Sequence, residues 1–162
     1  MKEITVALAG NPNVGKSTLF NRLTGLRQHT GNWPGKTVAL AEGWCARPEG
    51  RLHLVDLPGA YSLSADSPEE ELAGEFILSG RAQVTVVVAD ATNLARSLNL
   101  ALQIRQLTEH MVLCVNLLDE ARRKGIRVNL AALAQQLSCP VAGISARSGR
   151  GVEHLLALVN SL

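Results

Sequence analysis

Residues 10–17, with the sequence GNPNVGKS, constrain the fold of this chain more than any other stretch. They fit the pattern G-x-x-x-x-G-K-[ST], which binds phosphate when it joins a strand to a helix. Residues 4–9 form a short apolar run typical of a buried strand, and residues 17–23 have the pattern of the first turns of a helix. The motif therefore stands in the context that it requires, which makes a chance glycine-rich turn the weaker interpretation.

The chemistry of the motif explains its spacing. Gly10 and Gly15 allow the backbone to curl, so that successive N–H groups point at phosphate oxygens. A helix that begins near Lys16 adds the positive end of its dipole, and the Lys16 ammonium can reach the β- and γ-phosphates. The Ser17 hydroxyl can bind Mg²⁺. The motif therefore predicts that the chain binds a nucleoside triphosphate.

Length and composition narrow the class of protein. A chain of 162 residues suits one domain with one core, and 46% apolar against 19% charged residues indicates a globular chain. The net charge of +2 is too small to indicate nucleic acid or a membrane surface, and the basic residues 122–124 are interpreted as a solvated loop. No stretch approaches the roughly 20 apolar residues of a membrane span, and residues 1–3 leave no room for a signal peptide. We expect a soluble domain with no nucleic-acid partner and no membrane insertion of its own.

Cysteine and histidine are sparse. The three cysteines are widely spaced and odd in number, which indicates reduced thiols rather than a disulfide framework. The four histidines show no ligand spacing, so we expect no zinc or iron site in this chain.

Strand-like and helix-like patterns alternate along the chain. Residues 28–36, rich in Gly, Asn, Pro and Trp, are expected to form a mobile loop, and the turn at 47–50 predicts an antiparallel hairpin. Ser67 and Asn129 are in the position of helix N-caps. Strands are predicted at 4–9, 37–45, 51–56, 84–90, 111–115 and 141–145. Helices are predicted at 17–23, at 69–78, at 130–137 and at 152–159. A further amphipathic helix is predicted along the line of Leu94, Leu98, Leu102 and Gln106, flanked by Ala101, Ile104 and Leu107.

This alternation predicts an α/β fold. About six mostly parallel strands with one antiparallel edge hairpin, and about five helices, make a three-layer sandwich with helices on both faces of the sheet. In such a fold the ligand crevice lies at the carboxyl ends of the strands. The phosphate motif makes this the fold of a P-loop nucleotide-binding domain spanning residues 1–162.

The sequence NLLD at 116–119, directly after the strand at 111–115, indicates guanine as the base. The Asp119 carboxylate can accept from the N1–H and the 2-amino group of guanine together. Adenine lacks that pair of donors and would leave the carboxylate unpaired, at a cost of about 1–3 kcal/mol. Asn116 can bond the other edge of the base or tie its loop to the phosphate loop. Ser145, Ala146 and Arg147 match a small loop of backbone donors that completes a guanine pocket, although an ordinary turn explains them almost as well.

The sequence DLPG at 56–59 has the form of a metal and γ-phosphate loop. Asp56 can hold Mg²⁺ through water, and the Gly59 N–H can touch the γ-phosphate. The preceding loop has to supply a threonine, for which Thr37 is the best candidate and Thr30 the alternative. Ala60 stands where many GTPases carry the glutamine that orients water, so hydrolysis should be slow or depend on other groups. These features predict a small G-protein-like GTPase whose two loops are ordered by the γ-phosphate.

These motifs together resemble the FeoB family. The resemblance rests on GNPNVGKS at 10–17, GNWPGKT at 31–37, DLPGAYSL at 56–63 and the lysine-less NLLD at 116–119, with CPV at 139–141 leading to SAR at 145–147. It covers essentially the whole chain, and the GNWPGKT loop is its most specific element. The family member that it indicates is the N-terminal G domain of a bacterial ferrous-iron transporter.

The resemblance implies that potassium speeds GTP hydrolysis. An asparagine of the phosphate loop binds the ion in this family, and Asn13 stands at that position. Backbone carbonyls of the first switch loop complete the set, and Gly31 and Trp33 match them. Such a cation would stand in for an arginine finger. Asn13 could instead stabilise its loop, and Trp33 could anchor its loop by burying the ring.

The resemblance also implies a cytoplasmic domain of a protein in the bacterial inner membrane. The helical and transmembrane regions of that protein are absent here and are its expected partners, and self-association is open. We expect a GTPase that regulates or drives ferrous-iron uptake. A slow nucleotide-sensing switch that gates the transporter is the first alternative, and an RNA- or ribosome-associated GTPase is the second.

The expected ligands of the domain are GTP or GDP, Mg²⁺ and K⁺. The residues expected to contact nucleotide are Gly10, Asn11, Asn13, Val14, Gly15, Lys16, Ser17, Thr18, Thr37, Asp56, Gly59, Asn116, Asp119, Ser145, Ala146 and Arg147. Those expected to act in hydrolysis are Asn13, Lys16, Thr37 and Gly59. Those expected at Mg²⁺ are Ser17, Thr37 and Asp56, and those at K⁺ are Asn13, Gly31 and Trp33.

Overall fold

A computed structural model describes residues 2–26, 28–35 and 38–162. In these residues the chain forms seven strands and six helices. The strands are β1 (Lys2–Gly10), β2 (Gln28–Asn32), β3 (Ala39–Arg47), β4 (Gly50–Asp56), β5 (Val84–Asp90), β6 (Met111–Asn116) and β7 (Val141–Gly143). The helices are α1 (Lys16–Thr24), α2 (Pro68–Leu78), α3 (Leu94–Leu107), α4 (Leu118–Arg123), α5 (Leu130–Leu137) and α6 (Val152–Asn160).

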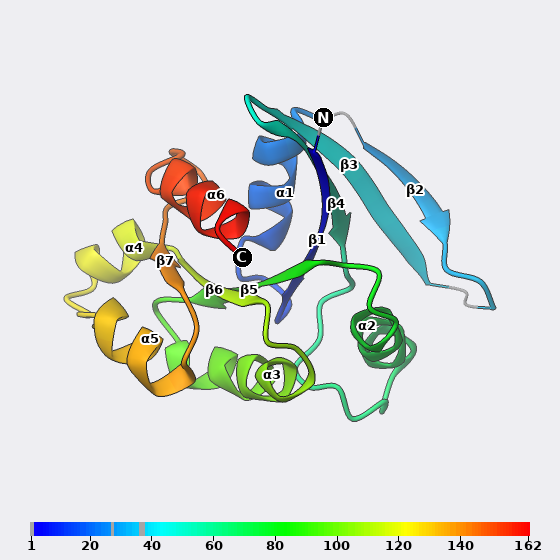
Figure 1. The fold of residues 1–162 in the computed structure, drawn as a ribbon. Helices are drawn as coiled ribbons and strands as arrows, with labels where there is room; N and C mark the ends of the chain where they lie inside the picture. The colour runs from blue at the N-terminus through cyan, green and yellow to red at the C-terminus, as the bar shows by residue number, and fades with distance from the viewer. Residues whose placement is uncertain (1, 27, 36–37) are drawn as a thin grey trace.

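The strands form one sheet in the order β2-β3-β4-β1-β5-β6-β7 (Figure 1). The five strands from β4 to β7 in this order are parallel, whereas β3 pairs antiparallel with both β4 and β2. Since the chain leaves β1 between β4 and β5, the loop after β1 opens at the point where strand order reverses. In open α/β sheets this is where ligands bind.

Helices cover both faces of the sheet and create two hydrophobic cores. On one face α1 and α6 pack on side chains such as Val6 and Leu8. On the other face α2, α3 and α5 pack on side chains such as Ala7 and Ala9. The alternation along β1 follows from the two-residue period of a strand. The predicted α/β three-layer sandwich with an antiparallel hairpin at one edge is therefore confirmed (Figure 1).

Two predicted loops contain regular structure. Residues 28–32 form β2, which pairs antiparallel with residues 39–43 of β3, although a loop was expected over 28–36. This strand has no apolar alternation because it lies at the sheet edge, where strand pairing and contacts of His29 with Glu42 and Trp44 hold it. The loop expected after β6 contains α4, whose first turn is acidic and whose last turn is basic, as a helix dipole favours.

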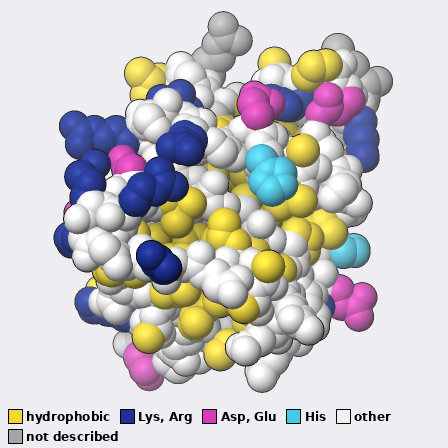
Figure 2. Space-filling view, turned by 90° about the vertical axis from the view of Figure 1, so that its left-hand side faces the viewer, with side chains coloured by type: hydrophobic (Ala, Val, Ile, Leu, Met, Phe, Trp, Pro, Cys, Tyr) yellow, Lys and Arg dark blue, Asp and Glu magenta, His cyan; other side chains and the backbone are white. Residues whose placement is uncertain are grey.

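The basic residues 122–124 lie at the end of α4, not in the predicted loop, and they are exposed. Arg123 and Lys124 pair with Asp119 and Glu120 at 3.8 and 3.7 Å, one helical turn away. Figure 2 shows the side of the molecule that carries α4, α5 and α6, where Lys and Arg side chains gather beside an apolar surface. Part of this positive charge is therefore neutralised within α4 itself.

Helix faces were predicted with mixed success. The four predicted core residues of α6, at 152, 155, 156 and 159, are all buried, and Ser67 and Asn129 cap α2 and α5 as expected. The predicted apolar line of α3 is wrong at Leu102, which is 52% exposed, whereas Leu94 and Leu98 pack partly buried against the core. Of the flanking residues, Ala101 and Ile104 are buried, and the helix also buries Ser97 and Leu100, which were not predicted.

The ends of two strands differ slightly from the predicted ones. β7 ends at Gly143, not at residue 145, and β3 begins at Ala39, not at residue 37. None of the helices formed by the described residues is both long and apolar enough to cross a membrane.

Candidate nucleotide-binding site

The phosphate motif lies between the end of β1 and the start of α1, as predicted. Its backbone is left-handed at Asn13, with φ of 67°, and at Gly15, with φ of 84°. A Cβ atom at Gly10 would lie 2.8 Å from the carbonyl oxygen of Val88, and one at Gly15 would lie 2.2 Å from Asn116 Nδ2. Close packing therefore requires glycine at both positions, and the left-handed backbone favours it at Gly15 as well.

Lys16 joins the motif to the end of β4. Its side chain is buried, with the residue 8% exposed, and Nζ contacts the Asp56 carboxylate and donates to the carbonyl oxygen of Leu57 at 2.6 Å. Burial raises the pKa of the Asp56 carboxyl, and the Lys16 charge opposes that rise. The ammonium and the carboxylate predicted to serve phosphate and Mg²⁺ are thus brought together in the fold.

The loop after β4 packs against the phosphate motif. The Ala60 N–H donates to the carbonyl oxygen of Gly10 at 3.0 Å. A Cβ at Gly59 would lie 3.1 Å from the Pro12 ring, so Gly59 sits directly against the motif. Between them is a cavity of about 370 Å³, lined by Asn11, Pro12, Asn13, Gly15, Lys16, Ser17, Thr18 and Gly59. Seven of these eight residues were predicted from the sequence to contact nucleotide.

Asn116 at the end of β6 connects three loops. It is 1% exposed, Nδ2 donates to the carbonyl oxygen of Val14 at 3.0 Å, and Oδ1 accepts from the Ala146 N–H at 2.9 Å. Of the two roles left open for this residue, the structure shows the tie to the phosphate motif. The same side chain fixes the loop that contains Ser145 and Arg147, so these predicted residues are brought together with the phosphate motif.

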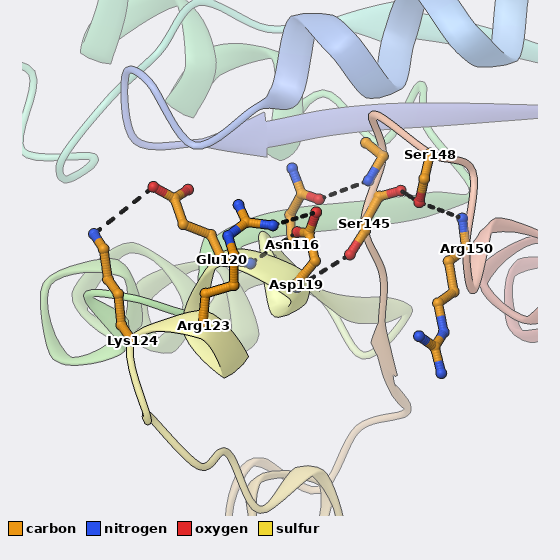
Figure 3. Close-up of polar contacts among 9 residues, drawn as sticks. Asn116, Asp119, Glu120, Arg123, Lys124, Ser145, Ser148 and Arg150 are labelled. Carbon is orange, nitrogen blue, oxygen red and sulfur yellow. Dashed lines mark hydrogen bonds and ion pairs between the residues drawn. The ribbon is translucent and has the colours of Figure 1, made fainter.

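Asp119 lies in the first turn of α4, beside Ser145 (Figure 3). Its N–H donates to Ser145 Oγ at 3.2 Å, and its Oδ1 accepts from the Glu120 N–H at 2.9 Å. The Ser145 hydroxyl and then the Glu120 N–H hold the pKa of the Asp119 carboxyl below its ordinary value. The side chain is 44% exposed, so an ionised acceptor faces solvent beside the loop at 145–147.

Gly31 and Trp33, the predicted potassium ligands of the first switch region, do not line this cavity. Trp33 lies against α2, with its ring centroid 5.3 Å from that of Phe76 in an edge-on arrangement and 5.0 Å from Arg81 Cζ. Gly31 pairs with Leu40 of β3. Gly31 and Trp33 line a different cavity of about 130 Å³, so the described residues do not bring them to Asn13. The anchoring interpretation of the Trp33 ring fits this packing. Thr37 lies outside the described residues, and the alternative, Thr30, lies in β2.

One face of α3 contributes residues that the sequence analysis missed. Arg96 Cζ lies 4.5 Å from the centroid of the Tyr61 ring, and Asn99 Nδ2 donates to the Tyr61 carbonyl oxygen at 3.3 Å. Gln103 Oε1 accepts from the Leu63 N–H at 2.6 Å. The carbonyl oxygen of Arg96 also accepts from Asn11 Nδ2 at 3.2 Å. Their spacing in the sequence could have identified them, because Arg96, Asn99 and Gln103 fall on one polar face of the helix.

Within residues 2–26, 28–35 and 38–162, no group of three or more His, Cys, Asp or Glu side chains is arranged to hold a metal ion. Cys45, Cys114 and Cys139 are buried as free thiols. Burial raises the pKa of the Cys114 thiol far above its ordinary value, which makes it inert packing rather than a reactive group.

A protein family described as Ferrous iron transport protein B matches residues 4–159 of the chain. The chain belongs to this family. Its family membership confirms the resemblance to FeoB. The Fe(2+) transporter FeoB of Salmonella typhimurium strain LT2 is 46% identical over 159 residues, which are 96% of this chain and 21% of that protein. The chain thus spans about a fifth of the length of the curated FeoB relatives that it matches.

Solved FeoB structures share the whole fold. The G domain of the T. maritima FeoB iron transporter has a TM-score of 0.92 and 38% identity, with 99% of this chain and 98% of that one covered. The cytosolic domain of T. maritima FeoB in its GMPPNP form has a TM-score of 0.94 and 39% identity, covering 98% and 63% of the two chains. The chain therefore has the P-loop GTPase fold of a FeoB G domain.

Proposed function

We propose that this chain is the GTP-binding and GTP-hydrolysing G domain of a longer ferrous-iron transporter. The observation that carries the proposal is the cavity between the phosphate motif and Gly59, joined through Asn116 to the loop at 145–147. Structures of T. maritima FeoB in GDP and GMPPNP forms support nucleotide binding in this fold. In the longer protein, the domain would be cytoplasmic and would regulate or drive ferrous-iron uptake together with the helical and transmembrane regions.

The residues that line the cavity, and those of the loops beside it, each have a proposed partner on the nucleotide. The backbone N–H groups of residues 11–18 and the Lys16 ammonium would bind the phosphates. The ionised Asp119 carboxylate would accept from the two donors of guanine. Asn116 would act by holding the loops, since both ends of its amide are already bonded to backbone groups. Ser145, Ala146 and Arg147 would close the base pocket.

The oxygen donors near the cavity fit Mg²⁺. The Ser17 hydroxyl lines the cavity, and the Asp56 carboxylate is in contact with Lys16, which lines it too. Hydroxyl and carboxylate oxygens are the ligands that this hard cation prefers. Ser17 and Asp56, with Thr37 as the proposed third residue, would hold the ion. When bound, Mg²⁺ neutralises charge on the phosphates.

For potassium, the described residues supply one of the three proposed ligands to the cavity. Asn13 offers a side-chain amide oxygen there, whereas Gly31 and Trp33 line the cavity beside α2. The full set in its described arrangement therefore does not fit one ion. We keep Asn13 as the residue through which potassium would stimulate hydrolysis, and the other two as proposals that require the first switch region to move.

One observation favours the slower alternative, a nucleotide-sensing switch. Ala60 is buried and its N–H is bonded to Gly10, so the position that carries a water-orienting side chain in many GTPases offers none here. Intrinsic hydrolysis would then be slow, and the bound nucleotide would act mainly as a signal to the rest of the transporter.

The proposed function is tested by nucleotide titration of the purified chain. A fluorescent GDP analogue, displaced by unlabelled GDP, GTP or ATP in the presence of Mg²⁺, reports both affinity and base selectivity. We expect displacement by GDP and GTP at concentrations about 10- to 100-fold lower than by ATP, because an Asp119 carboxylate left unpaired against adenine costs about 1–3 kcal/mol. Equal displacement by ATP would overturn the guanine assignment.

A further inference from the structure

Arg22 connects the helix behind the phosphate motif to the loop at 145–147. It lies in the last turn of α1, six residues after Lys16. Its Nε donates to the carbonyl oxygen of Ala146 at 2.7 Å, and its Nη2 donates to the carbonyl oxygen of Arg147 at 2.9 Å. These are contacts between segments 124 and 125 residues apart in the chain.

The two bonds require the geometry of a guanidinium. Its planar fork can donate to two neighbouring carbonyl oxygens at once, whereas the single ammonium of lysine cannot reproduce this arrangement. The group also lies close to the backbone at Gly149, where a Cβ atom would be 2.7 Å from Nη1. The Arg22 side chain is thus fitted to the shape of the 145–149 loop.

Ala146 is held from both sides. Its N–H donates to Asn116 Oδ1, and its carbonyl oxygen accepts from Arg22 Nε. Asn116 in turn is bonded to Val14 of the phosphate motif. The loop at 145–147 is therefore tied twice to the phosphate-binding segment, once through β6 and once through α1.

We propose that Arg22 is a positioning residue for nucleotide retention: by fixing the loop at 145–147 to α1, it keeps the base-binding loop in register with the phosphate motif. This inference rests on the proposed guanine-nucleotide function. Without Arg22 the loop keeps its tie to Asn116 but loses two charge-assisted hydrogen bonds on its other side. The base pocket then opens more often, and the nucleotide dissociates faster.

Arg105 offers a matched control. Its guanidinium also donates to backbone carbonyl oxygens, from Nε to Leu137 at 3.1 Å and from Nη2 to Ser138 at 3.0 Å, and thereby ties α3 to the end of α5. None of the described residues that line the cavity between the phosphate motif and Gly59 takes part in these contacts. Arg105→Gln therefore removes the same kind of interaction at a place where base binding is not involved.

The test measures the dissociation of a fluorescent GDP analogue from the wild-type chain and from Arg22→Gln, Arg22→Lys and Arg105→Gln, after mixing with excess GDP. We expect about a tenfold faster release from Arg22→Gln, because hydrogen bonds to a charged group are worth about that factor or more. Arg22→Lys should release at an intermediate rate, and Arg105→Gln at the wild-type rate. The thermal unfolding midpoint of each variant shows whether its fold is retained.

The outcomes separate this inference from the function on which it rests. If the wild-type chain fails to bind GDP, the proposed function falls. If the wild type binds GDP but Arg22→Gln releases it at the wild-type rate, the positioning role is wrong. If both glutamine variants release GDP faster in proportion to their loss of thermal stability, Arg22 has only a structural role and the inference is again overturned.

Discussion

The phosphate motif and the segment with Gly31 and Trp33 line different cavities and are built differently. Side-chain contacts tie the motif to three other segments, since the Lys16 ammonium contacts Asp56, Asn116 Nδ2 donates to the Val14 carbonyl, and Asn11 Nδ2 donates to a backbone carbonyl of α3. The first switch region is held by strand pairing between β2 and β3 and by the packing of Trp33 on α2. The proposed nucleotide-binding side is thus held by side-chain contacts between segments remote in sequence, whereas the segment with Gly31 and Trp33 is held by strand pairing and by ring contacts.

The strongest test of this comparison removes Lys16. Lys16→Ala deletes the ammonium proposed for the phosphates and leaves the buried Asp56 carboxylate without its partner. We expect roughly 100-fold weaker GDP binding, since a hydrogen-bonded charge pair is worth a few kcal/mol. Isothermal titration with GDP measures the loss. A change of less than threefold would show that the motif does not bind phosphate in the proposed way.

Asp119→Asn should have the next largest effect. The amide cannot accept from both guanine donors, so we expect the preference for GTP over ATP to fall by roughly tenfold or more, as for other lost polar contacts. Competition between the two nucleotides measures the ratio. Glu120→Gln, on the neighbouring residue of α4, is the control that should keep the preference.

The same residue makes a prediction about pH. The hydrogen bonds from Ser145 and Glu120 hold the pKa of Asp119 below its ordinary value, so the carboxylate stays ionised as the pH falls toward the ordinary Asp range. Guanine selectivity should therefore be constant between about pH 7 and pH 5, since an ordinary Asp carboxyl titrates near pH 4. A loss of selectivity centred near pH 6 would assign base recognition to another group.

Asn13→Ala tests the proposed potassium site, because Asn13 is the proposed ligand of the ion that lines the cavity. We expect stimulation by potassium to disappear, because the amide oxygen proposed for the ion is lost, while GDP affinity changes by less than about threefold. Asn160→Ala, at the end of α6 and away from the motif, is the control that should keep the stimulation. Stimulation that survives in Asn13→Ala would place the cation elsewhere.

Trp33→Ala should give the smallest effect, and it is an effect on stability. The substitution removes the edge-on ring contact with Phe76 and the stacking of Arg81. Because Trp33 is only partly buried, we expect a loss of about 1–2 kcal/mol in the free energy of unfolding, measured by urea denaturation. Trp33→Phe should recover part of it. No measurable loss would mean that the ring does not anchor this region.

The fold and the candidate site could be predicted from the sequence where chemistry requires particular residue types at a fixed spacing. The placement of the motif at 10–17 between β1 and α1, of residues 56–59 beside it and of Asn116 and Asp119 after β6 could be predicted, because glycine conformation and acceptor chemistry restrict each position. Parallel strands such as β5 were also predictable, since a strand buried on both faces is a continuous apolar run.

The remaining features depend on tertiary contacts. β2 could not be predicted because an edge strand of polar residues is defined by its pairing with β3. On α3 the sequence analysis missed Ser97 and Leu100, whose burial depends on how the helix packs on the sheet. The separation of Trp33 from Asn13 and the reach of Arg22 to Ala146 are distances between segments remote in sequence, which spacing along the chain does not contain.

GTP turnover by the purified chain in potassium and in sodium buffer, with Mg²⁺ in both, tests the central claim most directly. The account predicts GTP hydrolysis to GDP and phosphate that is slow in sodium, because Ala60 cannot orient water, and faster in potassium through Asn13. Equal and very slow rates in both buffers would contradict potassium-stimulated hydrolysis and leave a nucleotide-sensing switch. No turnover and no GTP binding would contradict the account as a whole.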